Sequence, residues 1–119
     1  MIITEITDLK LKRYFDVTGR ALKKVKINKK AEIDVEESAK DFLDMATRYF
    51  EDAKYFEKRC DYVNAFACLN YAHGWLDAGA RLGLFDVGGD SVLFTVDAEF
   101  VERKKKSIFK YFSCLLFNL

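Results

Sequence analysis

Residues 70–90, NYAHGWLDAGARLGLFDVGGD, contain the only histidine, the only tryptophan and five of the six glycines of the chain. A glycine-rich stretch of this kind forms either a phosphate-binding loop or a closely packed helix. At 100° per residue, the small side chains of this region fall on one stripe. The members of the stripe are Ala65, Cys68, Ala72, Gly79 and Gly83, flanked by Leu69, Leu76, Trp75 and Leu82. The sequence therefore predicts a helix whose small residues form the closest contact of a helical bundle.

Two further helices are predicted before this one. Residues 4–27 carry apolar side chains at approximate helical spacing, and residues 39–56 do so more regularly, at steps of three and four. Asp34 followed by Glu37 resembles a capping box, and Asp61 is a good N-cap for a third helix that runs to about residue 84.

Short connections between these segments force neighbouring helices to run antiparallel. We therefore expect an all-α fold, a three-helix up-down-up antiparallel bundle. After the third helix, FDVGGD (residues 85–90) predicts a turn, and SVLFTV (residues 91–96) predicts an extended arm along the bundle. Residues 1–96 would form the domain with its arm. Residues 97–119 would form a C-terminal extension, whose spacing of apolar residues allows a fourth amphipathic helix.

The composition limits the class of protein. The chain has 119 residues, which suits one domain, and no proline, which favours long uninterrupted helices. A net charge of +1 provides no general attraction for nucleic acid or an anionic membrane. Three cysteines without a C-x-x-C pair indicate buried thiols, and no apolar run reaches the length of a membrane span. We expect a soluble, cytoplasmic protein without a cofactor.

The opposite face of the third helix is polar and is the first candidate site. Asn70, His73, Asp77 and Arg81 lie along it, and Asp77 is four residues from both His73 and Arg81. A histidine oriented by a carboxylate beside an arginine can bind a phosphate or move a proton. A polar helix face is, however, usually the solvated one. With no nucleophile, second histidine or H-x-x-x-H spacing in this face, we predict neither a catalytic nor a metal site.

The charges of the first two helices are unequal and indicate a second candidate site. Residues 10–30 contain nine basic residues and one acidic residue, whereas residues 31–61 contain ten acidic and five basic residues. This contrast favours pairing of the two helices. The alternative is contact with nucleic-acid phosphates through Lys23, Lys24 and Lys26, although the aromatic groups used by single-strand binders are missing there.

Part of the chain resembles a known family. The residues that carry the resemblance are Asp61, Tyr62, Ala65, Leu69, Tyr71, Ala72 and GWLDAGARLGL at 74–84. They are similar to the archaeal domain-of-unknown-function family numbered 357. The resemblance covers roughly residues 4–96 and implies a small helical bundle in an archaeal cytoplasm. It implies no activity, because the family has none assigned.

Three functions follow as hypotheses. The leading one is a non-enzymatic protein-interaction or self-association module that uses the aromatic arm and residues 97–119. The second is a nucleic-acid-binding module that uses the basic first helix. The third is a small-ligand site on the polar face of the third helix.

Overall fold

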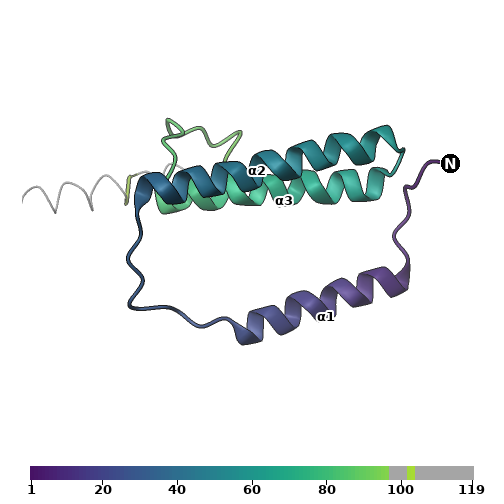
Figure 1. Cartoon of the computed structure of the whole chain (residues 1–119), viewed down its shortest axis with the longest axis horizontal. Coiled ribbons are helices and arrows are strands. Elements are labelled where there is room, and N and C mark those ends of the chain that lie inside the picture. The colour runs from purple at the N-terminus through teal and green to yellow at the C-terminus, as the bar shows by residue number, and fades with distance from the viewer. Residues whose placement is uncertain (97–101, 104–119) are drawn as a thin grey trace, which may run out of the picture.

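A computed structural model describes residues 1–96 and 102–103. It contains the helices α1 (Asp8–Lys24), α2 (Val35–Lys58) and α3 (Tyr62–Leu82), drawn in Figure 1. Within the described residues there is no strand, and the only β-type pairing is an isolated parallel bridge between Ile3 and Asp61. No described helix is both long and apolar enough to cross a membrane. The predicted all-α class is confirmed.

Each helix begins at a side chain that satisfies a free amide of the first turn. Thr7 accepts a hydrogen bond from the Lys10 amide, Asp34 from the Glu37 amide, and Asp61 from the Asn64 amide. The N-caps predicted at Asp34 and Asp61 are confirmed. The first helix is shorter than the predicted residues 4–27, because Thr7 caps it and the backbone becomes extended at Val25.

Helices α2 and α3 form an antiparallel hairpin whose interface is made of small residues. Ala46 and Ala53 of α2 are 4% exposed, and Ala65 and Ala72 of α3 are 8% and 5% exposed. Rings from both helices close one side of this seam, in edge-to-face pairs with centroids 4.9 Å apart for Phe42 and Trp75 and 4.4 Å for Tyr49 and Tyr71. The predicted role of the small stripe as the closest helix contact is confirmed for Ala65 and Ala72.

Two glycines of the stripe have other roles than helix contact. Gly83 ends α3 in the left-handed conformation, with φ of 84°. Its amide donates to the Ala80 carbonyl, and the Leu84 amide donates to the Gly79 carbonyl, which is the Schellman arrangement. Gly79 itself faces the ring of Phe85, because a β-carbon at this position would overlap that ring. Gly79 therefore lets the chain fold back against α3 after the helix ends.

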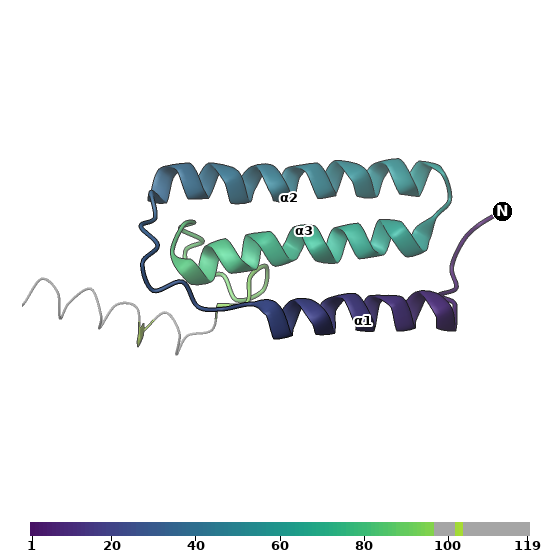
Figure 2. The same cartoon turned by 60° about the horizontal axis from the view of Figure 1, so that its bottom comes forward.

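Helix α1 stands apart from the hairpin, so the expected three-helix packing is not confirmed. Successive helices run in opposite directions in Figures 1 and 2, but α1 has no buried residue. The hydrogen bonds that join this part of the chain to the hairpin lie just before α1 and in its first turn. The Ile3 amide donates to the Cys60 carbonyl at 2.8 Å, and Lys10 Nζ donates to Asn64 Oδ1 at 3.1 Å. Periodicity predicted the apolar stripe correctly, but it carries no information on which surface the stripe meets.

The segment after α3 is a series of turns, so the prediction of an extended arm at residues 91–96 is wrong. The Asp86 carboxylate accepts from the Gly88 amide, and the Asp90 carboxylate accepts from the amides of Val92 and Leu93. The hydrogen bonds between these aspartates and nearby backbone amides stabilise turns. They outweigh the preference of the β-branched residues in this segment for an extended strand. We call residues 85–96 the arm. The predicted turn at FDVGGD is confirmed, and the predicted fourth helix lies outside the described residues.

The contact between Gly79 and Phe85 can be tested by a double-mutant cycle. We expect Gly79→Ala to destabilise the fold by about 1–3 kcal/mol, because the new methyl group displaces the ring. In a Phe85→Ala background, where no ring obstructs the methyl group, the same change should instead stabilise the helix by about 0.5–1 kcal/mol. Gly74→Ala is the control: a β-carbon there has no neighbour within 4 Å, so it should stabilise the helix by about 0.5–1 kcal/mol. Equal costs in both backgrounds, measured by chemical denaturation, would contradict this role of Gly79.

Because the Asp61 carboxylate caps α3, we expect part of the free energy of unfolding to be lost at low pH. The hydrogen bond from the Asn64 amide lowers the pKa of the Asp61 carboxyl below 3.8. Because the folded pKa is the lower one, this contribution is complete above 3.8 and is lost as the pH falls through the folded pKa. In Asp61→Asn, the free energy of unfolding should therefore fall less steeply between about pH 4 and about pH 2. Parallel profiles for the two proteins would show that the cap is not titrating.

Candidate functional site

The polar face of α3 holds the arm. Asp77 accepts two hydrogen bonds from Thr95, at 2.9 Å from the backbone amide to Oδ1 and at 2.9 Å from the hydroxyl to Oδ2. Arg81 donates to the Thr95 carbonyl at 3.1 Å. Both the amide and the carbonyl of one arm residue are thus bound by two side chains that lie four residues apart on α3.

His73 extends this contact by one turn of the helix. Its Nε2 lies 2.7 Å from the Leu93 carbonyl oxygen, so a proton on Nε2 donates to this carbonyl. The same nitrogen lies 3.7 Å from Asp77 Oδ1, and the ring stands 6.3 Å from the Phe94 ring. The side chain of His73 is 51% exposed and that of Asp77 24% exposed. We call His73, Asp77 and Arg81 the polar clamp.

Asn70, the fourth residue predicted for this site, does not join the clamp. Its side-chain amide donates to the Phe66 carbonyl within α3, at 3.2 Å. The structure therefore brings together three of the four predicted residues, and it adds Leu93 and Thr95 as their partners. Nothing in the local sequence indicated these partners, because the contacts to Leu93 and two of the three to Thr95 use backbone atoms, which every residue type provides. The clamp binds the arm at Leu93 and Thr95, next to Val96, which is 3% exposed.

The basic residues predicted to contact nucleic acid lie at the end of α1. Lys23 and Lys24 belong to its last turn, and Lys26 follows the C-cap Val25. All three are exposed. Their position is favourable for the helix dipole, whose negative end lies there.

The cysteines that the structure describes are half-buried rather than buried as expected. Partial burial raises the pKa of the Cys68 thiol, and the nearby carboxylates of Asp52 and Asp61 raise it further. A raised pKa keeps this thiol protonated and a poor nucleophile at neutral pH. Across residues 1–96 and 102–103, no group of three or more histidine, cysteine, aspartate or glutamate side chains could hold a metal ion.

An apolar groove runs between α2 and α3. The residues that line it are Leu43, Ala46, Thr47, Phe50, Leu69, Ala72, His73 and Leu76. We call it the α2–α3 groove. Its alanines are buried, whereas Leu43, Phe50 and Leu69 remain 52%, 48% and 44% exposed. Leu69 and Leu76 were predicted to flank the helix contact, but their spacing did not indicate that this edge stays open.

If the clamp holds the arm, removing a clamp side chain should increase the mobility of the arm and leave the hairpin unchanged. Asp77→Ala should remove both bonds to Thr95 and release the arm, so hydrogen exchange at the Thr95 amide should become as fast as in an unstructured peptide. Exchange in the middle of α2 should not change. Asn70→Ala, on the same face of α3, is the matched control and should leave the arm protected. Protection of Thr95 that survives in Asp77→Ala would show that the clamp does not hold the arm.

Comparison with known proteins identifies the family of the chain. A family model described as "Protein of unknown function (DUF357)" matches residues 13–85, from the first turns of α1 to the residue that packs on Gly79. This is a narrower range than the resemblance at residues 4–96 implied. No curated protein and no solved structure is detectably similar to the chain. The match covers more than half of the sequence, and the chain belongs to the DUF357 family.

Proposed function

We propose that the chain is a non-enzymatic protein-interaction module and that α1 is its contact element. The observation that supports this is the exposure of an apolar face on a well-formed helix. Leu11, Phe15 and Leu22 are 49%, 73% and 74% exposed, and Val25 at the C-cap is 73% exposed. We call these four residues the α1 stripe. They are spaced as i, i+4, i+11 and i+14, which places them on one side of the helix.

An exposed face of this kind is costly for an isolated chain. Burial of large apolar side chains lowers the free energy of the system by about 25 cal/mol per Å² of apolar surface removed from water. Contiguous exposed apolar patches therefore mark interaction surfaces in proteins that fold stably. The alanines and aromatic pairs that close the seam of the hairpin all belong to α2 and α3, and none belongs to α1. The α1 stripe is thus available to a partner without any loss of the hairpin core.

The charges around the stripe describe the surface that would bind it. Helix α1 contains six basic and two acidic residues. A complementary partner has an apolar face rimmed by carboxylates, in the manner of an amphipathic helix that enters a groove. The proposed partner is therefore a helical protein surface with an acidic rim.

The proposal is tested by comparing how much stability the dilute protein loses when an exposed phenylalanine and a packed phenylalanine are each replaced by alanine. Phe15 is 73% exposed, whereas Phe42 packs edge-to-face on Trp75. Phe15→Ala should change the free energy of unfolding by no more than about 0.5 kcal/mol, and Phe42→Ala should lower it by about 2 kcal/mol or more. Chemical denaturation at low micromolar concentration measures both.

The result that overturns the proposal is a large loss of stability in Phe15→Ala. Such a loss would show that α1 packs on its own hairpin and serves the fold. Leu22→Ala provides an independent check at a second position of the α1 stripe, where the exposure is 74%.

A further inference from the structure

We infer that the partner of α1 is a second copy of this chain. In this dimer the α1 stripe of each copy lies in the α2–α3 groove of the other. The inference rests on the proposed function, since it requires that Phe15, Leu22 and Val25 of the stripe are free in the monomer. It adds the identity of the partner and the surface that receives the helix.

The groove combines a floor of small residues with walls of large apolar ones. Its floor is formed by Ala46 and Ala72, which are 4% and 5% exposed, so the backbones of α2 and α3 can be approached closely. Its walls are formed by Leu43, Phe50 and Leu69, each about half exposed. Small residues between large ones match the knobs of an amphipathic helix, and the α1 stripe supplies such knobs at helical spacing.

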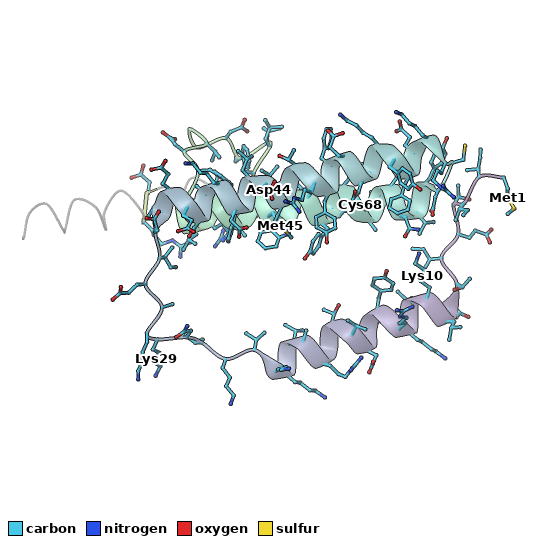
Figure 3. The ribbon with its side chains drawn as sticks, viewed as in Figure 1. Met1, Lys10, Lys29, Asp44, Met45 and Cys68 are labelled. Carbon is cyan, nitrogen blue, oxygen red and sulfur yellow. The ribbon has the colours of Figure 1, made fainter. Side chains whose placement is uncertain are left out.

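The chain's own α1 is held on another side of α3. The first turns of α1, which include Leu11 of the α1 stripe, line a separate pocket with Val63, Phe66 and Ala67 of α3. At 100° per residue, Ala72 and Leu76 of the groove lie about 140° and about 180° around the helix from Ala67. Figure 3 shows Lys10 at the end of α1 nearest the hairpin, where it bonds to Asn64. The groove is thus open to the α1 of another molecule while the chain's own α1 is attached elsewhere.

The two helices that would meet in the dimer, α1 and α2, carry opposite net charges. Helix α2, one wall of the groove, contains seven acidic and four basic residues, against six basic and two acidic in α1. Three of the α2 carboxylates form ion pairs within their own helix, Glu36 with Lys40, Asp44 with Arg48 and Glu51 with Lys54. These pairs are at least half exposed and weakly held, so they can exchange partners with the cations of an incoming α1.

Exchange of α1 between two copies gives a closed assembly. Each molecule provides one helix and one groove, and a two-fold axis lets both contacts form at once. A dimer of this kind has no helix or groove left to bind a third copy. It covers the α1 stripe and the half-exposed walls of the groove together.

The test uses two variants that each break one half of the contact. Phe15→Glu damages α1 and leaves the groove intact, whereas Leu69→Glu damages the groove and leaves α1 intact. In sedimentation equilibrium the full-length chain should pass from 13.8 kDa to twice that mass as its concentration rises. Each variant alone should remain monomeric over the same range. An equimolar mixture of the two should form a heterodimer, because it retains one intact helix in one intact groove. Recovery on mixing is specific to reciprocal exchange.

Matched controls separate the contact from nonspecific effects. Val17→Glu changes an exposed apolar residue of α1 outside the stripe, and Tyr55→Glu changes an exposed residue of α2 outside the groove. Both should dimerise as the unmodified chain does. Leu43→Glu repeats the groove test at a residue that is 52% exposed, in case Leu69→Glu does not fold.

Three outcomes would overturn the inference. The first is a full-length chain that stays monomeric at all concentrations. The second is association that Leu69→Glu abolishes and Phe15→Glu does not, which would mean that another segment, such as residues 97–119, covers the groove. The third is no recovery on mixing. If any of these is found while Phe15→Ala leaves the stability of the dilute protein unchanged, the interaction function stands and only the identity of the partner is wrong.

Discussion

The close approach of α2 and α3 through their alanines is the contact on which the rest of the structure depends. Because Ala46, Ala53, Ala65 and Ala72 carry only methyl groups, the two helices bury each other along this seam. The aromatic pairs then close one side of the seam, while the other side remains as a groove. The position of α3 also determines where the arm is held and where α1 begins.

Several of these features could be predicted from local sequence. The caps at Asp34 and Asp61 and the turn at FDVGGD depend on side chains that bond to backbone a few residues away, so their residue types are sufficient signals. The seam of small residues was also predictable, because helical periodicity alone places Ala65 and Ala72 on one face of α3.

What the sequence could not predict depends on contacts between distant residues. The stripe of α1 is evident, but its amphipathic pattern does not say whether it meets its own hairpin, another chain or water. The polar clamp shows the same limit, because His73 and Asp77 have partners about twenty residues away that are recognised mainly through backbone atoms. Residues predicted as a candidate ligand site thus hold the arm in place.

Helix α1 is formed in the monomer, most of its apolar face is exposed there, and we propose that association covers this face. Hydrogen exchange, measured by mass spectrometry at a low and a high protein concentration, distinguishes the two states of α1. In dilute solution the amides of α1 should exchange much faster than those of α3, and at high concentration the exchange of α1 should slow while the core of the hairpin is unchanged. Strong protection of α1 in dilute solution, equal to that of α3, would show instead that α1 packs stably on its own hairpin.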